Sequence, residues 1–329
     1  MEIGNVILDV KGMKKYFPIQ SGFFQKITGF IKAVNDVDFF IYEGETLGLV
    51  GESGCGKTTL GRCILRAIEP TSGKTLFRNE KGEVVDVNAL NYKEMRNIRK
   101  DMQLIFQDPY SSLNPRMTVF NIIAEPLLCN NILRGKALKD RVIEIIELVR
   151  LSSKYLEYYP HAFSGGQRQR IGIARALATN PKLVICDEAV SALDVSVQAQ
   201  ILNLLRDLQE KLNMSYLFIS HDLGVVQHIS DRVCVMYVGK IVEAASAREL
   251  FSNTAHPYTQ ALLRARPIPD PRIKLERSIL PGEVANPAKP PSGCYFHPRC
   301  KYVKDICSVQ APEWKEVSPG HSVLCHRST

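Results

Sequence analysis

Residues 46–59 read TLGLVGESGCGKTT, and this stretch decides the fold. Its first five residues predict a buried strand, and the residues that follow the stretch predict a helix. The glycines between them allow the backbone to curl so that successive N–H groups and the positive end of the helix face phosphate oxygens. Strand, glycine loop and helix in this order predict a site for the phosphates of a nucleotide.

The residues of this loop have separate expected roles. The Lys57 side chain is expected to reach the β and γ phosphates, and the Thr58 hydroxyl is expected to bind Mg²⁺. A chance glycine-rich turn is a poor alternative, because the flanking strand and helix agree with a phosphate site. The other loop residues expected to contact the nucleotide are Gly51, Ser53, Gly54, Cys55, Gly56 and Thr59.

A second apolar run, residues 182–186, predicts another buried strand, and Asp187 and Glu188 follow it directly. An acid at the carboxyl end of a parallel strand lies beside a nucleotide loop, where Asp187 can hold Mg²⁺. Glu188 can then orient or deprotonate the attacking water. Alone this signal is weak, because strands often end in solvated acids. Beside a phosphate loop it predicts nucleotide hydrolysis.

A third motif occupies residues 163–170, which read FSGGQRQR and precede an apolar helical run. Ser164 is a good N-cap, and Gly165 and Gly166 leave the start of the helix open to close approach by an anion. In isolation the motif indicates only a capped helix. Together with the two motifs above, it closely resembles the signature of ATP-binding cassette (ABC) ATPases, and the resemblance covers residues 4 to about 250.

The resemblance implies an ATPase that works as a dimer. In that family two chains associate head to tail, and the signature helix of each contacts the γ phosphate held by the other. Asp194 lies in a stretch that resembles the loop crossing this dimer interface. The residues that would contact the neighbour's ATP are Ser164, Gly165, Gly166 and Gln167.

Three further positions match residues with roles in the family. Gln107 matches the glutamine that joins the Mg²⁺ and water shell to the membrane partner, and His221 matches the switch histidine on the γ phosphate. Tyr16 is placed like the aromatic residue that stacks on adenine, although Phe17 is a close rival. The resemblance thus implies ATP and Mg²⁺ as ligands, with the metal held by Thr58, Gln107 and Asp187 and catalysis by Glu188, Gln107 and His221.

Two residues depart from the family pattern. Phe163 stands where many cassettes have leucine, and Ala189 follows the acidic pair where proline is more usual. Neither change removes a chemical group, so an intact hydrolytic site is expected. Ala189 can loosen the turn that aims Glu188, because it lacks the fixed φ of proline.

Other stretches are more specific than the general cassette pattern. Residues 113–117 and the insert before Ala33 resemble the second of two ATPase subunits of peptide importers. This implies a homologous ATP-binding subunit as heterodimer partner, two membrane permeases and an extracytoplasmic peptide-binding protein. The wider likeness to ATP-binding subunits of oligopeptide and dipeptide importers lies in residues 44–57, 105–109, 112–117, 256–259 and 290–294.

The composition is that of a soluble globular protein, with 329 residues, 45% of them hydrophobic, and a net charge of +8. No apolar run is long enough to span a bilayer, and the first five residues lack the features of a secretory signal. These observations predict a cytosolic chain. The importer resemblance implies a peripheral protein on the cytoplasmic face of the inner membrane.

Charge and prolines are unevenly distributed along the chain. Residues 257–329 hold 11 Lys/Arg, 6 Asp/Glu and 11 of the 18 prolines. This shift predicts an ABC ATPase domain over 1–256 and a proline-rich extension over 257–329. The expected fold is α/β, with a mostly parallel nucleotide-binding sheet, an antiparallel β piece near the start and a helical insert over about 108–165.

The rival class is a soluble ABC ATPase that acts on ribosomes or nucleic acid, since a basic tail weakly favours such partners. Cassettes of that class usually resemble two fused cassettes or carry long coiled-coil inserts, and this sequence has neither. Trp314 and the three tyrosines of the tail are not set among closely spaced Lys/Arg, as stacking platforms would be. No nucleic-acid partner is therefore expected.

Four of the nine cysteines fall in the last 36 residues, and in a reducing cytosol such a group indicates a metal site rather than disulfides. The spacing lacks the paired knuckles of structural zinc sites and resembles importer tails that carry a [4Fe-4S] cluster. Zinc is the second alternative and unligated thiols are the third. The cysteines are Cys294, Cys300, Cys307 and Cys325, and the histidines close enough in sequence to replace one are His297, His321 and His326.

The insert at residues 19–31 carries apolar residues at helical spacing, which predicts one face of a short helix. A face packed on its own domain is favoured over contact with a permease or with lipid headgroups. The residues of this face are Phe23, Phe24, Ile27, Phe30 and Ile31.

Overall fold

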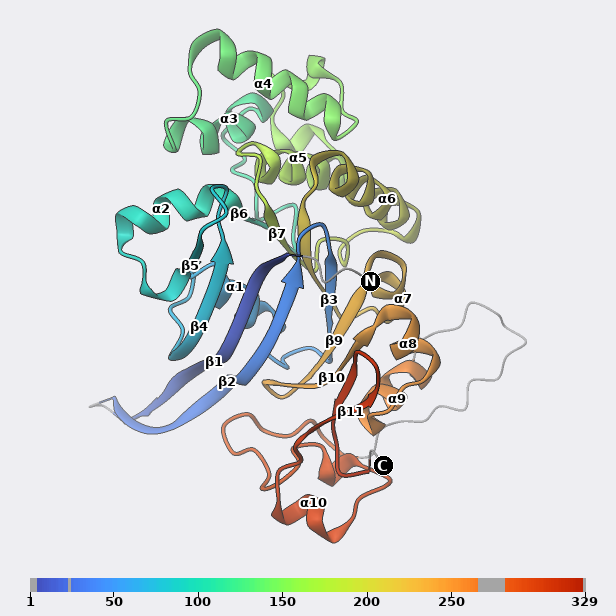
Figure 1. The fold of residues 1–329 in the computed structure, drawn as a ribbon. Coiled ribbons are helices and arrows are strands. Elements are labelled where there is room, and N and C mark those ends of the chain that lie inside the picture. Colours follow the sequence, from blue (N-terminus) through green and yellow to red (C-terminus); the bar gives the residue numbers. More distant parts are fainter. Residues whose placement is uncertain (1–4, 23–24, 266–281, 328–329) are drawn as a thin grey trace. The chain divides into compact units, whose positions relative to one another are not determined.

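The computed structural model describes residues 5–22, 25–265 and 282–327. Strands and helices are both present throughout, which confirms the expected α/β class (Figure 1). The chain groups into two compact units. The first unit comprises Met1–Asp9, Phe40–Thr46 and Leu76–Ile219, and the second comprises Val10–Phe39, Leu47–Thr75 and Ser220–Thr329.

The first unit is built on three parallel strands in the order β8-β7-β6. Every residue of β7 and β8 is buried, as expected of apolar parallel strands covered on both faces. The strand predicted at 182–186 is β7, displaced by one residue. The bounds are β6 (Met102–Ile105), β7 (Leu183–Asp187) and β8 (Ser215–Ser220).

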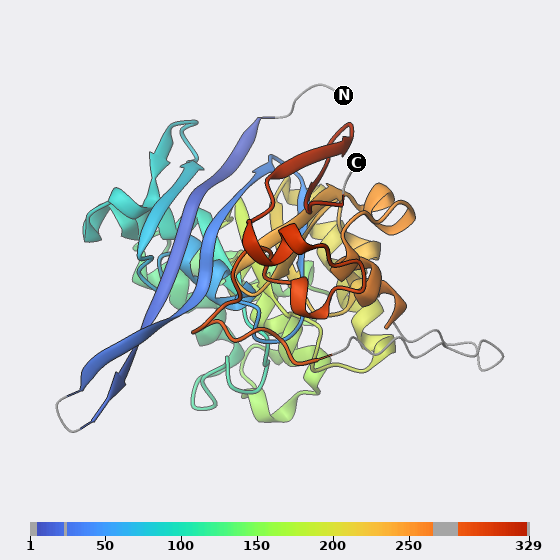
Figure 2. The same ribbon diagram turned by 90° about the horizontal axis from the view of Figure 1, so that it is seen from below.

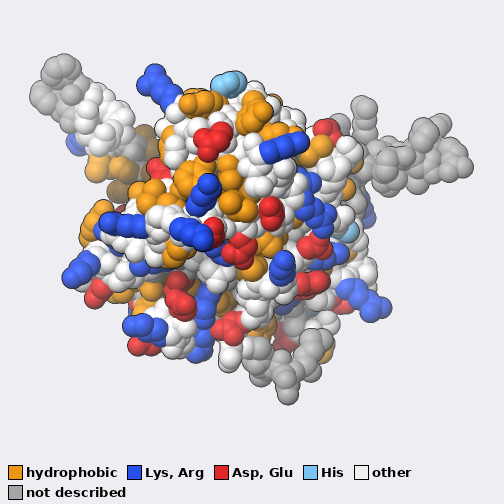
Figure 3. All heavy atoms as spheres, turned by 90° about the horizontal axis from the view of Figure 1, so that it is seen from above, with side chains coloured by type: hydrophobic (Ala, Val, Ile, Leu, Met, Phe, Trp, Pro, Cys, Tyr) orange, Lys and Arg blue, Asp and Glu red, His pale blue; other side chains and the backbone are white. Residues whose placement is uncertain are grey.

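Helices form most of the rest of this unit. Helices α3 and α4 lie within the stretch 108–165 where the helical insert is predicted, and both pack on α5. On the face shown in Figure 3, which lies uppermost in Figure 1, hydrophobic side chains are interspersed with charges of both signs. The helix bounds are α2 (Tyr92–Asp101), α3 (Val119–Cys129), α4 (Gly135–Leu148), α5 (Gly165–Leu177) and α6 (Val195–Leu212).

The second unit contains a mixed sheet in the order β11-β12-β10-β9-β3. Strands β3 and β9 are parallel, whereas β9, β10, β12 and β11 pair antiparallel in turn. The C-terminal strands β11 and β12 therefore extend the sheet that begins with the strand before the phosphate loop. The bounds are β3 (Thr46–Val50), β9 (Arg232–Tyr237), β10 (Lys240–Ser246), β11 (Trp314–Ser318) and β12 (His321–Leu324).

Short helices flank this sheet. Residues 282–313, which include α10, form turns and short helices (Figure 2). No helix in the described parts of the chain is long and apolar enough to cross a membrane. The helix bounds are α1 (Lys57–Ile64), α7 (Leu223–Ile229), α8 (Ala247–Ser252), α9 (Pro257–Arg264) and α10 (Asp305–Val309).

The remaining strands are antiparallel elements near the start of the chain. Figures 1 and 2 show β1 and β2 as a long two-stranded arm. The short strand β5 pairs antiparallel with β4. The bounds are β1 (Val6–Ser21), β2 (Lys26–Tyr42), β4 (Ser72–Arg78) and β5 (Val84–Asp86).

The short helix predicted at residues 19–31 is wrong, because residues 19–21 belong to β1 and residues 26–31 belong to β2. Gly22 has a φ of +76°, and the Gln25 N–H donates to its carbonyl at 3.1 Å, so the chain reverses here. Strand-forming residues follow the turn, and this local preference overrides the helical spacing. Of the predicted face, Ile27, Phe30 and Ile31 are exposed on β2, whereas Phe23 and Phe24 lie outside the described residues.

Candidate nucleotide-binding site

The phosphate loop of the second unit joins β3 to α1, as its sequence predicts. Gly56 precedes the helix with a φ of +109°, and a Cβ there would lie 2.0 Å from the Ala33 carbonyl oxygen. Only glycine fits this position. The Lys57 ammonium donates to the carbonyls of Gly51 at 2.7 Å and Glu52 at 3.0 Å, so the loop curls around its lysine.

The aromatic residue predicted to stack on adenine belongs to the same unit. The Tyr16 hydroxyl donates to Asn35 Oδ1 at 2.6 Å, and its backbone N–H donates to Thr71 Oγ1 at 2.9 Å. Its ring is half-buried, with the Lys32 ammonium 5.9 Å from the centroid. The rival Phe17 has the Lys15 ammonium 4.9 Å from its ring. The choice between the two rings stays a prediction.

In the first unit, parallel strands bring two of the predicted catalytic residues together. Strands β6 and β7 run side by side with Ile105 opposite Cys186, so the residues after each strand meet at one edge. Gln107 Nε2 donates to Glu188 Oε2 at 2.9 Å. Asp187, the last residue of β7, is buried with 3% of its surface exposed.

The backbone of Glu188 is unusual, with a φ of +50°. A non-glycine residue in the left-handed region is strained, and such strain is concentrated at functional sites. The Glu188 N–H donates to the Ile219 carbonyl at 3.0 Å, and Ser191 Oγ donates to the Glu188 carbonyl at 3.0 Å. Ser191 thus holds the turn even though buried Ala189 stands where proline is more usual.

The signature motif lies at the start of α5. Ser164 Oγ accepts from the Gln167 N–H at 3.4 Å, and Gln167 Oε1 accepts from the Ser164 N–H at 3.0 Å. This capping box confirms the predicted N-cap. Ser164 is exposed, and a Cβ on Gly166 would lie 2.5 Å from Val197 Cγ1, so that glycine allows α5 and α6 to approach closely.

Asp194 and His221 lie just before two other helices. Asp194 caps α6, accepting from the Val197 N–H at 2.9 Å and from Ser196 Oγ at 2.7 Å. The hydrogen bond from Ser196, followed by that from the Val197 N–H, lowers the pKa of the Asp194 carboxyl. His221 follows β8 and precedes Asp222, the N-cap of α7. Asp194 lies in the first unit and His221 in the second.

Sequence reasoning missed the residues that hold the phosphate loop from the C-terminal extension. The Arg299 guanidinium donates to both carboxylate oxygens of Glu52, at 2.8 and 3.1 Å. The Glu52 N–H donates to the Tyr258 hydroxyl at 2.9 Å. Local pattern could not reveal an ion pair between residues 247 apart in sequence. The C-terminal extension therefore contacts the phosphate loop although the two are distant in sequence.

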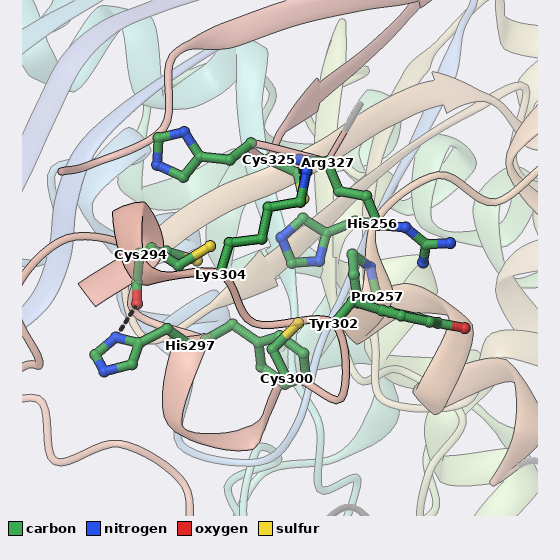
Figure 4. Close-up of a pocket in the computed structure, with 12 residues that line it drawn as sticks. His256, Pro257, Cys294, His297, Cys300, Tyr302, Lys304, Cys325 and Arg327 are labelled. Carbon is green, nitrogen blue, oxygen red and sulfur yellow. Dashed lines mark hydrogen bonds between the residues drawn. The ribbon is translucent and has the colours of Figure 1, made fainter. Parts of the chain in front are cut away.

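The four cysteines of the extension line one pocket (Figure 4). Burial, then Cys325, Cys307 and Cys300, raise the pKa of the Cys294 thiol to about 11. Burial is also the main cause that raises the pKa of Cys300. In the described parts of the chain, however, no three His, Cys, Asp or Glu side chains are arranged to hold a metal ion.

The surroundings of this pocket carry positive charge and hydrogen-bond donors. Lys304 and Arg327 line it beside the cysteines, as Figure 4 shows. The Arg327 N–H donates to Cys325 Sγ at 3.4 Å, and backbone N–H groups also lower the pKa values of Cys294 and Cys300. A set of four thiols with such donors fits the ligand chemistry of a thiolate-bound metal centre. Of the three candidate histidines, His297 and His326 line the pocket.

Comparison with known proteins agrees with these observations. The profile of the ABC transporter family matches residues 34–191, and that of the oligopeptide/dipeptide transporter C-terminal region matches residues 242–307. The chain is 52% identical over 323 residues to the oligopeptide transport ATP-binding protein AppF of Bacillus subtilis (strain 168), covering 97% of each chain. It is 49% identical to the probable peptide ABC transporter ATP-binding protein y4tS of Sinorhizobium fredii, covering 98% of this chain and 90% of that protein.

A solved structure shows the same fold. The dimeric ATP-binding cassette MJ0796, in a post-hydrolysis state bound to ADP and Pi, matches with a TM-score of 0.64 and 28% identity, covering 74% of this chain and 99% of that chain. The fold and motifs thus define an ABC-type ATPase. More particularly, the chain belongs to the ABC transporter ATP-binding proteins that carry the oligopeptide/dipeptide transporter C-terminal region.

Proposed function

We propose that this protein hydrolyses ATP to power the uptake of oligopeptides or dipeptides through a membrane transporter. The hydrogen bond between Gln107 and Glu188 carries the proposal, because it joins the two residues expected to handle the attacking water. The C-terminal profile and the names of the relatives support peptides as the cargo. The rival activity on ribosomes or nucleic acid is not favoured, since these relatives are transport proteins.

In this proposal each of the expected site residues has one role in the hydrolysis of ATP. Lys57 neutralises the β and γ phosphates, and Thr58, Gln107 and Asp187 hold Mg²⁺. Glu188 takes the proton of the water that attacks the γ phosphorus in line, and ADP leaves. The remaining role in the reaction, contact with the γ phosphate, falls to His221.

The remaining nucleotide contacts come from a second ATP-binding chain. At the start of α5, Ser164 is exposed and Gly165, Gly166 and Gln167 are half-buried, and an anion can bind to such a helix start with help from the helix dipole. We assign these residues to the ATP of a homologous partner, and Asp194 to the interface with that partner. Two permeases and an extracytoplasmic peptide-binding protein complete the transporter, with this chain on the cytoplasmic face of the membrane.

The test is peptide uptake by the purified transporter in lipid vesicles. Vesicles with this subunit, its partner ATPase, both permeases and the binding protein should accumulate labelled oligopeptide only when ATP faces this subunit. A matched preparation with Glu188→Gln should accumulate none. ATP-dependent uptake of a different solute class, with no peptide uptake, would contradict the assigned cargo.

For the C-terminal extension, treated as a separate domain over residues 257–329, we propose that the four cysteines bind a [4Fe-4S] cluster, with zinc as the alternative. Support comes from the four thiols in one pocket and from the cations of Lys304 and Arg327, which suit an anionic centre. The side chains must move to ligate it, since they do not form a metal site as they stand. When bound, the cluster supplies a cross-link among four segments of the extension.

Protein purified without oxygen tests this assignment. It should be brown and contain about four irons per chain. Cys300→Ser should lower the iron content, whereas Cys129→Ser, at an exposed cysteine outside the pocket, should not. One zinc per chain and no colour would reject the cluster and identify zinc as the bound metal.

A further inference from the structure

One short segment of the extension contacts the phosphate loop and also Asn35, the hydrogen-bond partner of Tyr16. Residues 295–299 lie between the first two pocket cysteines. Tyr295, Phe296 and Arg299 each contact a different part of the second unit, although the segment is more than 200 positions from the loop. Through these contacts the extension can affect the geometry of the phosphate loop and so the binding of a nucleotide.

The contact on the loop is an ion pair between a buried arginine and a half-buried glutamate. Arg299 is 6% exposed and Glu52 is 25% exposed, and two parallel N–H···O bonds join them. A bidentate arginine–carboxylate pair fixes the orientation of both groups. The hydrogen bonds to Glu52 are the main cause that raises the pKa of Arg299 above its ordinary value.

The backbone of Glu52 is held as firmly as its side chain. Its N–H donates to the Tyr258 hydroxyl at 2.9 Å, and its carbonyl accepts from the Lys57 ammonium at 3.0 Å. Its position therefore helps to fix the lysine that is expected to bind the phosphates. A movement of the Glu52 backbone must displace a hydrogen-bond acceptor of Lys57.

Aromatic packing anchors the segment that carries Arg299. Phe296 is 2% exposed, and its ring packs on Tyr237 and Tyr258 with centroids 5.3 and 5.4 Å apart. Tyr258 is fully buried. Because Tyr258 supports both Phe296 and the Glu52 N–H, the extension and the loop share one rigid support.

A second connection reaches the proposed adenine side. Asn35 Nδ2 donates to the Tyr295 hydroxyl at 2.9 Å, and Asn35 Oδ1 accepts from the Tyr16 hydroxyl at 2.6 Å. This chain of hydrogen bonds orients the Tyr16 ring from the extension. It is independent of the ion pair, since none of its three residues contacts Glu52 in the bonds described.

We propose that Arg299 is a positioning residue for nucleotide binding, which holds Glu52, and through it Lys57, in the geometry that receives the phosphates. The inference rests on the proposed nucleotide role of the loop. Arg299 does not touch the nucleotide and acts only through Glu52. Its loss therefore weakens binding of the nucleotide rather than the chemical step.

The experiment measures ADP affinity in the full-length chain by calorimetry. Arg299→Gln should weaken ADP binding by about tenfold, because it leaves the Glu52 carboxylate without its main partner. Tyr258→Phe removes only a hydroxyl and should weaken binding by about threefold. Two matched controls should bind ADP like the wild type. Arg141→Gln removes the ion pair of Arg141 with Glu144 at 2.9 Å. Tyr216→Phe removes a buried hydroxyl that donates to the Leu205 carbonyl.

A double-mutant cycle separates positioning from general support of the fold. If Arg299 acts through Glu52, then Arg299→Gln combined with Glu52→Gln should bind ADP no more weakly than the weaker single variant. In the assembled transporter, Arg299→Gln should raise the KM for ATP and leave kcat near the wild-type value. Additive losses in the cycle, or a fall in kcat without a rise in KM, would overturn the proposal.

Two outcomes distinguish this inference from the proposed function. Wild-type protein that binds no ADP would reject the nucleotide role of the loop itself. If the wild type binds ADP and Arg299→Gln binds it equally well, the positioning role alone is rejected. If Arg299→Gln does not fold, unchanged ADP binding in both Tyr258→Phe and Glu52→Gln rejects that role.

Discussion

Gln107 and Glu188 are 81 residues apart in sequence, yet Gln107 Nε2 lies 2.9 Å from Glu188 Oε2 and donates a hydrogen bond to it. The pairing of β6 with β7 brings them together. A glutamine that donates to one oxygen of a general base restrains the orientation of that carboxylate. The pair is therefore suited to hold a water molecule in line for attack.

Replacing the glutamine should slow the chemical step. Gln107→Ala removes the donor and should lower kcat of the assembled transporter by about 10- to 100-fold, with ATP affinity changed much less. Steady-state turnover and nucleotide binding are the two measurements. Gln103→Ala is the matched control, because Gln103 lies on β6, the strand that precedes Gln107, but donates to the Arg99 carbonyl. Equal losses in both variants would show that the strand, rather than Gln107, matters.

The phosphate loop should not tolerate a side chain at Gly56. Gly56→Ala places a methyl group against the Ala33 carbonyl in a left-handed backbone, and should cost about 1–3 kcal/mol of unfolding free energy. Gly172→Ala, in α5 where nothing lies within 4 Å of the added atom, should be neutral or stabilising by up to about 1 kcal/mol. Thermal unfolding of both variants tests this, and equal melting temperatures would count against the loop geometry.

Turnover should depend on assembly, because the proposed function assigns the signature residues at the start of α5 to a neighbour's nucleotide. The isolated chain should be mostly monomeric and hydrolyse ATP slowly. Activity should rise with protein concentration and again when the partner ATPase and permeases are added. A fast enzyme that stays monomeric across the concentration range would be inconsistent with the proposed sharing of residues.

The attachment of β12 to β10 should weaken as pH rises. His321 Nε2 lies 2.8 Å from Glu243 Oε1, and this hydrogen bond is the main cause that raises the pKa of His321 above 6.5, with Glu249 adding to it. A raised histidine pKa contributes stability that is fully present below 6.5 and is lost as pH rises through the folded value. The difference in unfolding free energy between wild type and His321→Gln should therefore be largest near pH 5.5 and shrink above neutrality. A difference that grows with pH would reverse the assignment.

Local patterns in the sequence predicted the parts of the site that depend on neighbours along the chain. The strand before the loop, the glycine turn and the Ser164 cap all appear where expected, because each is fixed by interactions within a few residues. The apolar spacing at 19–31 gave a wrong prediction of a helix, because the β-branched residues and a glycine turn favour the strands that form there. The ion pair of Arg299 with Glu52 could not be predicted, because it depends on how the extension packs on the second unit.

The central claim is that Glu188 activates the water that hydrolyses ATP at this site. Single-turnover hydrolysis by the assembled transporter carrying Glu188→Gln tests it most directly, alongside Lys57→Ala. The account predicts that Glu188→Gln binds ATP, remains in a closed dimer and releases almost no phosphate, whereas Lys57→Ala fails at binding. Phosphate release at the wild-type rate from the Glu188→Gln transporter would contradict the account.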